Sequence, residues 1–217
     1  MYLVSGSWLL RIFYPQFVWS IPTEEKNIYL TFDDGPHETA TPFVLNELKK
    51  YNAKASFFCI GKNVEEHPAI FQQIINEGHS VGNHTFNHLN GWKTDDDIYV
   101  ENIIKADELI HSNLFRPPYG RMRKSQFKRL RTANCELKTV VMWSVLSGDF
   151  DIHLSPEKCL SNVIRSAKSG SIIVFHDSTK AFERMSFALP QVLEYFTNKG
   201  YNFKAIDQGM VNGLYSQ

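Results

Sequence analysis

Residues 28–36 read Ile-Tyr-Leu-Thr-Phe-Asp-Asp-Gly-Pro, an apolar run that ends in two carboxylates and a Gly-Pro pair. Runs rich in Ile, Tyr, Thr and Phe favour strands, so we expect a buried strand at Ile28–Phe32 and a sharp turn at Gly35 and Pro36. Comparable runs recur farther along the chain and predict further strands of a sheet. They are Ala55–Ile60, His79–Gly82, Thr139–Val145 and Ser171–Phe175, with a weaker one at Tyr201–Ala205.

Segments with helical spacing of apolar residues lie between the predicted strands. The clearest covers Pro156–Lys168, with Ser155 as its expected N-cap and Gly170 after its end. Two others are marked by apolar residues within Phe71–Ile75 and Leu189–Phe196. Alternation of strands and helices is typical of an α/β fold with a parallel sheet, either open and doubly wound or closed as a barrel.

Composition excludes several classes of protein. The chain has 217 residues, of which 43% are hydrophobic and 21% charged, so it suits one domain and is not intrinsically disordered. The formal net charge of +0 gives no electrostatic reason to expect nucleic acid as a partner. Three cysteines cannot form a disulfide framework.

Residues 1–25 form an aromatic-rich N-terminal segment, which we expect to pack against the outside of the domain; contact with a membrane interface is the alternative. The apolar run Met1–Leu10 is shorter than the roughly 20 residues that a membrane-spanning helix needs. It also lacks the positive start and the cleavage site of a signal peptide. Localisation therefore stays open between the cytoplasm and the cell envelope, and we expect a monomer.

Polar side chains follow the predicted strands. Because α/β folds place their sites at the carboxyl ends of parallel strands, we expect these side chains to share one site. In chain order they are Asp33 and Asp34, Asn83 and His84, Asp149, and His176 and Asp177.

A candidate metal site comes from His84 and His88, which are four residues apart. This spacing places two imidazoles on one face of a helical turn, and a carboxylate from a neighbouring strand end would complete a set with open coordination positions. Each motif alone has a plainer explanation. The pair Asp33-Asp34 could be a solvated turn, and the two histidines could be structural.

Two further elements suit acid–base chemistry. In Arg-Pro-Pro-Tyr-Gly at 116–120, Arg116 could hold a carboxylate in a fixed orientation, although a surface proline turn is the alternative. His176 follows an apolar strand, where a histidine is usually structural. At the edge of a metal site it becomes a candidate general acid.

Taken together, these motifs resemble the polysaccharide deacetylase family, carbohydrate esterase family 4. The family pattern of TFDDGP, H[ST]xxH and RPPYG is matched in order by Thr31–Pro36, His84–His88 and Arg116–Gly120. The resemblance extends over about Lys26 to Asp207. It implies a distorted (β/α) barrel with about seven parallel strands, in a catalytic domain that covers residues 26–217.

The resemblance also implies roles for individual residues. Asp34, His84 and His88 would bind a divalent metal, which we expect to be Zn²⁺, with Co²⁺, Ni²⁺ or Mn²⁺ compatible. Asp33 would be the catalytic base and His176 the general acid. The remaining catalytic positions are Arg116, which would hold the base, Asp149, which would orient His176, and Tyr119, whose backbone N–H would stabilise an oxyanion.

The chain departs from the family pattern in two motifs. Leu146 and Phe150 stand where the family usually has Asp and Trp, and Val174 stands where it usually has Leu. None of these changes removes a proposed ligand or proton-transfer group, so we expect an active enzyme with altered specificity. The expected substrate contacts are Pro118, Tyr119, Phe150 and Val174.

The implied function is hydrolysis of N-linked acetyl groups on N-acetylglucosamine-type sugars. The substrate would be a polysaccharide, an oligosaccharide or a lipid-linked glycan, such as peptidoglycan or a chitin-like chain. One alternative is hydrolysis of a non-sugar amide by the same groups. Another is an inactive glycan-binding relative, which should have lost a metal ligand or Asp33; this chain has lost neither.

Overall fold

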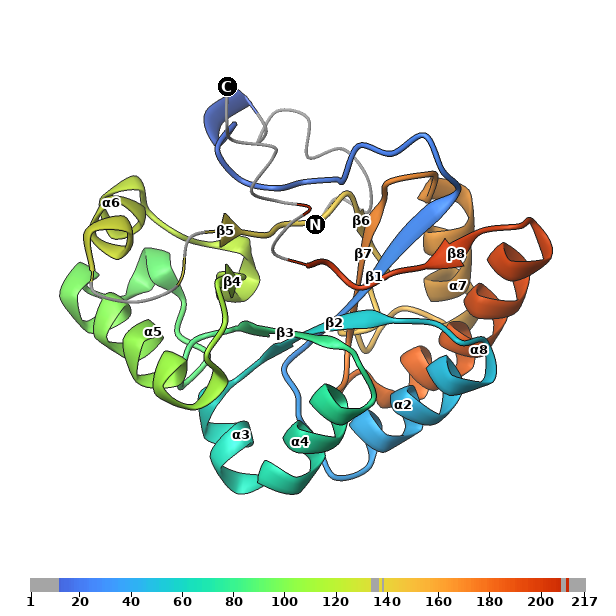
Figure 1. The fold of residues 1–217 in the computed structure, drawn as a ribbon, viewed down its shortest axis with the longest axis horizontal. Coiled ribbons are helices and arrows are strands. Elements are labelled where there is room, and N and C mark those ends of the chain that lie inside the picture. Colours follow the sequence, from blue (N-terminus) through green and yellow to red (C-terminus); the bar gives the residue numbers. More distant parts are fainter. Residues whose placement is uncertain (1–11, 134–136, 138, 208–209, 211–217) are drawn as a thin grey trace.

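The computed structural model describes residues 12–133, 137, 139–207 and 210. Within these residues, seven parallel strands form one curled sheet in the order β5-β4-β3-β2-β1-β7-β6, and a short β8 pairs with β1 (Figure 1). This half-barrel confirms the predicted distorted (β/α) barrel. The strands are β1 (Asn27–Asp33), β2 (Ala55–Cys59), β3 (Ser80–Asn83), β4 (Leu114–Phe115), β5 (Thr139–Val140), β6 (Val145–Leu146), β7 (Ile172–His176) and β8 (Asn202–Phe203).

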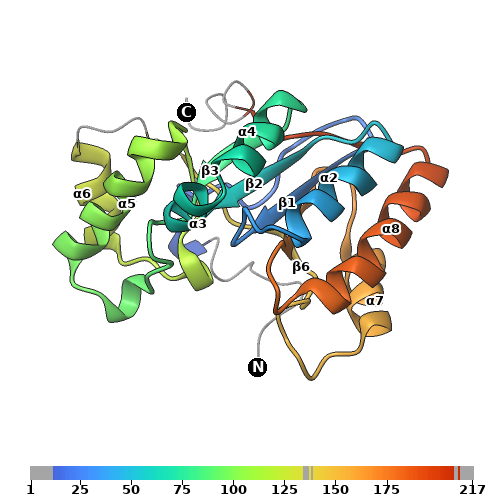
Figure 2. The ribbon, with the colours of Figure 1, turned by 90° about the horizontal axis from the view of Figure 1, so that it is seen from below.

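Helices surround the outside of the curled sheet (Figures 1 and 2). The predicted helix at Pro156–Lys168 is α7, which ends two residues earlier than expected, and the Ser155 hydroxyl accepts a hydrogen bond from the Lys158 backbone N–H at 3.2 Å as its N-cap. Two other predicted segments lie in α4 and α8. The helices are α2 (Ala40–Lys50), α3 (Gly61–Glu66), α4 (Pro68–Asn76), α5 (Asp96–Ile110), α6 (Lys124–Thr132), α7 (Pro156–Ser166) and α8 (Phe182–Asn198).

Strand β1 lies at the centre of the sheet, between β2 and β7, and each of its residues is buried. Helices cover the sheet, which explains why its sequence is a continuous apolar run rather than an alternating one. In the parallel register, Asp33 at the end of β1 pairs with His176 at the end of β7. Strand pairing alone therefore brings two of the predicted site residues side by side.

The prediction of one strand at Thr139–Val145 was wrong. Strand β5 pairs with β4 at one end of the sheet, whereas β6 pairs with β7 at the other end. The backbone between them must cross the open side of the half-barrel, so it cannot continue as a single strand. Sequence patterning also missed β4, which is only two residues long.

The N-terminal segment spans this open side, where it is the dark blue trace at the top of Figure 1. Val18 forms a parallel bridge with Val141, and Ser20 forms an antiparallel bridge with Ser171. Phe17 and Trp19 are buried in the same cluster of apolar side chains as Phe115 of β4. Residues 17–21 are thus part of the domain interior.

The start of the N-terminal segment is not part of this interior packing where the structure describes it. Ile12 and Phe13 are exposed at 64% and 61%, and Met1–Leu10 lie outside the described residues. Among the helices that the structure describes, none is both long and apolar enough to cross a membrane.

Replacement of the buried indole in this segment tests how far the fold depends on it. We expect Trp19→Ala to lower the free energy of unfolding by about 3–5 kcal/mol, because it leaves a cavity beside the β4 end of the sheet. Urea denaturation followed by circular dichroism measures the change. The exposed aromatic residue six positions earlier provides the control, and Phe13→Ala should change the free energy by no more than about 0.5 kcal/mol. Equal effects of the two substitutions would contradict an interior role for residues 17–21.

Candidate active site

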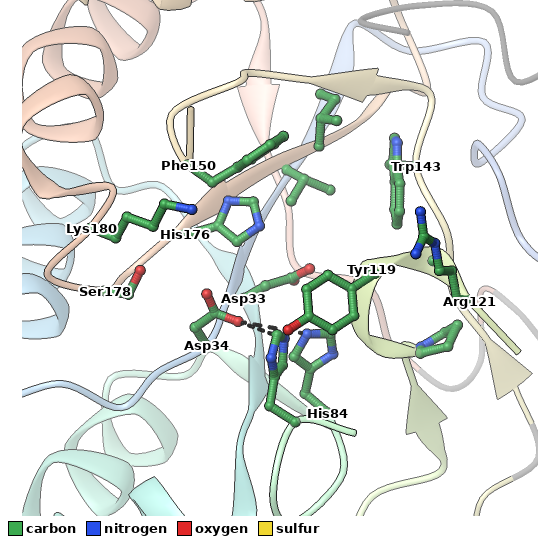
Figure 3. A pocket seen from close by; sticks show the side chains of 15 residues that line it. Asp33, Asp34, His84, Tyr119, Arg121, Trp143, Phe150, His176, Ser178 and Lys180 are labelled. Carbon is green, nitrogen blue, oxygen red and sulfur yellow. Dashed lines mark ion pairs between the residues drawn. The ribbon is translucent and has the colours of Figure 1, made fainter. Parts of the chain in front are cut away.

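A pocket of about 580 Å³ lies at the carboxyl ends of the central strands (Figure 3). It is lined by Asp33 from β1, by His84 and His88 after β3, and by His176 from β7. The predicted site residues therefore come together at one edge of the sheet. Arg116 and Asp149 lie behind the pocket wall, where both are fully buried.

Three side chains could hold a metal ion. One ligand atom from each of Asp34, His84 and His88 lies within 4.8 Å of the others. Asp34 Oδ1 is 3.2 Å from His88 Nε2 and 3.8 Å from His84 Nε2, and it is buried without a hydrogen-bond partner among the described residues. An orphaned buried oxygen facing two imidazole nitrogens fits a divalent cation that accepts lone pairs from all three.

The protonation state of His84 supports the same arrangement. Its Nδ1 lies 2.7 Å from the Arg116 carbonyl oxygen, which can only accept, so Nδ1 carries the proton and the lone pair of Nε2 is available to a cation. Burial lowers the pKa of His84 to about 4, so the ring is neutral at pH 7. Burial alone would raise the pKa of Asp34, but the neighbouring His88, His176 and His84 rings hold it below its ordinary value. His84 and Asp34 are thus in the protonation states that metal ligands need.

The expectation that His84 and His88 lie on a helical turn was wrong. Both are in the loop after β3, where Thr85 and His88 adopt left-handed backbone angles with φ of 64° and 55°. The Asn83 side chain accepts a hydrogen bond from the Thr85 N–H at 2.8 Å, and the Thr85 hydroxyl accepts one from the Leu89 N–H at 3.1 Å. A tight loop held by its own side chains, rather than helical periodicity, brings the two imidazoles together.

Asp33 is held by a buried ion pair. The Arg116 Nη1 donates to Asp33 Oδ1 at 2.6 Å and to the Thr31 hydroxyl at 2.7 Å. Its Nε and Nη2 donate to the carbonyl oxygens of Val141 and Met142 at 3.0 and 2.9 Å. With its donors directed at four separate oxygens, the guanidinium has little freedom, so the Asp33 carboxylate is fixed in orientation.

His176 is held in the same way on the other side of the pocket. Its Nδ1 lies 2.8 Å from Asp149 Oδ1, and its backbone N–H donates to Asp149 Oδ2 at 2.6 Å. Burial would lower the pKa of His176, but the Asp149 carboxylate outweighs it and raises the pKa to about 10. Near neutral pH the ring is therefore an imidazolium whose remaining N–H, on Nε2, is available as a proton donor.

The turn between Asp33 and α2 depends on Asp177, which was expected near the site but without a particular role. Asp34 has a φ of 81°, and the following Gly35 N–H donates to Asp177 Oδ1 at 3.0 Å. A Cβ at Gly35 would lie 2.1 Å from Asp177 Oδ2, so only glycine fits there. Thr41 donates to that same oxygen at 2.5 Å, and burial raises the pKa of Asp177 to about 8. The sequence signal for this contact is that Asp177 directly follows His176 at the end of a buried strand.

The expected substrate contacts fall into two groups. Tyr119, Phe150 and Val174 line the pocket, and the Tyr119 side chain is 60% exposed with its ring 4.7 Å from that of His88. Pro118, also a predicted contact, is buried and lies outside the pocket lining, whereas the preceding Pro117 lines the pocket.

Other pocket residues have no counterpart among the predicted site residues. Leu146 lines the pocket and, like Phe150 and Val174, is one of the positions at which the chain departs from the family pattern. Trp143, Arg121 and Lys180 also line it. They lie outside the recognised motifs, so no spacing or pattern in the sequence could have identified them.

Several known proteins are similar to this chain in sequence. The profile of a family described as polysaccharide deacetylase matches residues 20–138. A peptidoglycan-N-acetylglucosamine deacetylase of Bacillus cereus is 34% identical over 196 residues, which cover 88% of this chain and 91% of that protein. A chitooligosaccharide deacetylase of Azorhizobium caulinodans is 34% identical over 164 residues, 72% of this chain and 76% of that one.

A solved structure shows the same fold. It is a crystal structure of a peptidoglycan N-acetylglucosamine deacetylase and superimposes with a TM-score of 0.82 at 32% sequence identity. The match covers 93% of this chain and 95% of the other.

Removal of a metal ligand should abolish tight binding of the cation. Loss of groups that only support ligands typically costs 10–100-fold in metal affinity, so we expect Asp34→Ala or His84→Ala to weaken Zn²⁺ binding by more than about 100-fold. Competition with a chromophoric chelator measures the affinity without any need for activity. His153 is exposed on the chain after β6, and His153→Ala should retain wild-type affinity. Tight binding by Asp34→Ala would contradict the assignment of the ligands.

The Asp149 carboxylate should set the pKa of His176. In Asp149→Asn the strongest interaction that raises the pKa is lost while burial remains, so we expect the pKa of His176 to fall well below about 10. A raised pKa stabilises the folded protein fully below about pH 6.5, and this contribution is lost as the pH rises through about 10. Asp149→Asn should therefore be less stable than wild type at neutral pH.

Ring resonances of His176 in the metal-free protein, followed by nuclear magnetic resonance across pH, report this pKa directly. If His176 titrated at the same pH in wild type and in Asp149→Asn, the carboxylate would not be the cause of the shift.

Proposed function

Because the chain belongs to the polysaccharide deacetylase family, we propose that it is a metal-dependent hydrolase that removes N-linked acetyl groups from N-acetylglucosamine-type sugars of peptidoglycan or a chitin-like glycan. One observation carries this proposal. Asp33, held by buried Arg116, and His176, held by buried Asp149, flank the Asp34–His84–His88 cluster in a single pocket. A base and an acid on either side of a metal site are what amide hydrolysis requires.

Asp34, His84 and His88 would hold the cation. When bound, a divalent ion supplies Lewis-acid polarisation of the acetamide carbonyl and lowers the pKa of water. We propose Zn²⁺, because it accepts one oxygen and two imidazole nitrogens and leaves an open position in such a set. Co²⁺, Ni²⁺ and Mn²⁺ are compatible with the same donors.

Asp33 acts as the base in this proposal. Arg116 occupies its Oδ1 at 2.6 Å, so Oδ2 is the oxygen that accepts the proton of the attacking water. The base lines the pocket although its side chain is almost fully buried, so little solvent competes for it. The oxyanion that forms on the carbonyl would accept a hydrogen bond from the Tyr119 backbone N–H, and such a donor is typically worth about 2.7–4 kcal/mol.

His176 completes the reaction as the acid. An amine leaves from a tetrahedral carbon only when its nitrogen is protonated, and the His176 imidazolium holds a proton at Nε2 for this step. Asp33 has then gained one proton and His176 has lost one, and the products are a free sugar amine and acetic acid, which releases its proton to solvent and becomes acetate. Asp149 keeps the donor charged and oriented through its contacts with the ring and with the backbone N–H.

Two alternatives remain distinct from this function. A non-sugar amide could be hydrolysed by the same groups, and substrate profiling separates that reaction from deacetylation of a glycan. An inactive glycan-binding relative should lack a metal ligand or the base. The three proposed metal ligands and Asp33 are all present and converge in the pocket, which favours an enzyme.

Replacement of the two proton-transfer groups tests the proposed function. We expect Asp33→Asn and His176→Ala each to lower the rate of acetate release from chito-oligosaccharides and peptidoglycan fragments by at least about 100-fold, because general acid–base catalysis contributes about 10²–10⁴-fold. Neither residue is a proposed metal ligand, so bound Zn²⁺ should persist in both variants.

Acetate is measured with a coupled enzymatic assay, with and without a chelator, and the cation by elemental analysis of the same samples. His153→Ala is the control and should match wild type. Unchanged acetate release by Asp33→Asn would rule out Asp33 as the base. Oligosaccharide binding with no acetate from any substrate would favour the binding-only alternative.

A further inference from the structure

Two cationic side chains line the pocket but have no part in the proposed chemistry. Lys180 lies in the loop between β7 and α8, and Arg121 directly follows the turn that contains Tyr119. Figure 3 shows Lys180 beside His176 and Ser178 on one side of the pocket, and Arg121 beyond Tyr119 on the opposite side. The proposed catalytic centre thus lies between two positive charges.

Neither cation is neutralised by a neighbour. Within the described part of the chain, Lys180 and Arg121 make no ion pair with a carboxylate, although both side chains are exposed. The Arg121 guanidinium instead lies 5.1 Å from the centre of the Trp92 ring, a contact that positions it and leaves its charge in place. By contrast, Arg123, two residues later, is paired with Asp96 at 2.7 Å.

No carboxylate among the described residues of the pocket lining is available to neutralise these two cations. Among the described residues, Asp33 and Asp34 are the carboxylates that line the pocket. Asp33 is already paired with Arg116, and Asp34 belongs to the metal cluster. The outer part of the pocket is therefore positive, although the formal net charge of the chain is +0. Such a local field favours a substrate that carries negative charge near the reacting group.

We propose that Lys180 and Arg121 bind carboxylates on the sugars next to the acetylated sugar, so that the protein prefers acidic glycans to neutral chitin-type chains. The inference rests on the proposed function, because it takes the acetyl group to lie between Asp33 and His176. Guanidinium and ammonium groups are the usual partners of carboxylates. Cations on opposite sides suit a glycan in which acetylated and acidic sugars alternate, since each reacting sugar then has an acidic neighbour on both sides.

Two kinds of sugar could supply this carboxylate: a lactyl ether, as in N-acetylmuramic acid, and a uronic acid. The first experiment therefore uses three tetrasaccharides. One alternates N-acetylglucosamine with N-acetylmuramic acid, one alternates it with glucuronic acid, and one is neutral chitotetraose. The quantity measured is kcat/KM for acetate release from each acidic tetrasaccharide divided by that from chitotetraose.

We expect this ratio to exceed one in the wild type for at least one acidic tetrasaccharide, and that tetrasaccharide identifies the source of the carboxylate. Lys180→Gln and Arg121→Gln should each lower the ratio about three- to tenfold, as expected for a partly exposed charge contact. The double variant should lower it by about the product of the two factors, because the side chains lie on opposite sides of the pocket. Added salt should lower the wild-type ratio by screening.

Matched variants separate a local contact from a change in overall charge. Lys128 in α6 and Arg165 in α7 are exposed and lie outside the pocket lining. Lys128→Gln and Arg165→Gln remove the same charges from the chain and should leave the ratio at its wild-type value. An equal fall of the ratio in these variants would overturn the proposal.

A binding measurement separates this inference from the proposed function. Calorimetric titration of the Zn²⁺-loaded Asp33→Asn protein with each tetrasaccharide gives a dissociation constant that needs no turnover. Tighter binding of an acidic tetrasaccharide than of chitotetraose, weakened by Lys180→Gln and Arg121→Gln, supports the proposal. This holds even if the wild type releases no acetate, because that result would contradict only the proposed function. Equal affinities for acidic and neutral tetrasaccharides, unchanged by both substitutions, would overturn it.

Discussion

The buried guanidinium of Arg116 is the group on which the rest of the site depends. A charge removed from water must be both neutralised and hydrogen-bonded, and Arg116 meets this need through Asp33, Thr31 and two carbonyl oxygens of the crossing between β5 and β6. These partners belong to the centre and to the open side of the half-barrel. One side chain from the end of β4 therefore fixes the proposed base and ties together parts of the sheet that strand pairing leaves separate.

The need to pair buried polar groups also fixes the side chains on the opposite side of the pocket. Asp149 is fully buried, and its two oxygens accept from the ring and from the backbone N–H of His176. Asp177 is fully buried as well and accepts from Gly35 and Thr41, which holds the turn that carries Asp34. Each buried acidic side chain is thus matched to specific donors at short range. This explains how a chain with a formal net charge of +0 can contain a strongly charged site.

Much of this arrangement could be predicted from the sequence, because the apolar runs at β1 and β7 and the motifs after them are local signals. Once the strands are parallel, their register places Asp33 beside His176 without further information. The features that could not be predicted depend on pairing between distant residues. Strand β4 has two residues, too few for a periodic pattern, and the burial of Trp19 depends on the gap that the crossing leaves between β5 and β6. The left-handed backbone at Thr85 and His88 is likewise decided by side-chain hydrogen bonds within the loop.

Burial divides the site into residues whose substitution would destabilise the protein and residues whose substitution would alter only local contacts. Asp33, Arg116 and Asp149 are at most 4% exposed, and loss of any one of them would leave a partner charge unpaired inside the protein. Tyr119, Arg121 and Lys180 face solvent, so a substitution there costs only the contacts of that side chain. Leu146 and Phe150 line the pocket as well, and the Phe150 ring lies 5.2 Å from that of His176. The reaction can therefore stay the same while the glycan that is recognised changes, and the positive outer part of the pocket is where this chain would set its own preference.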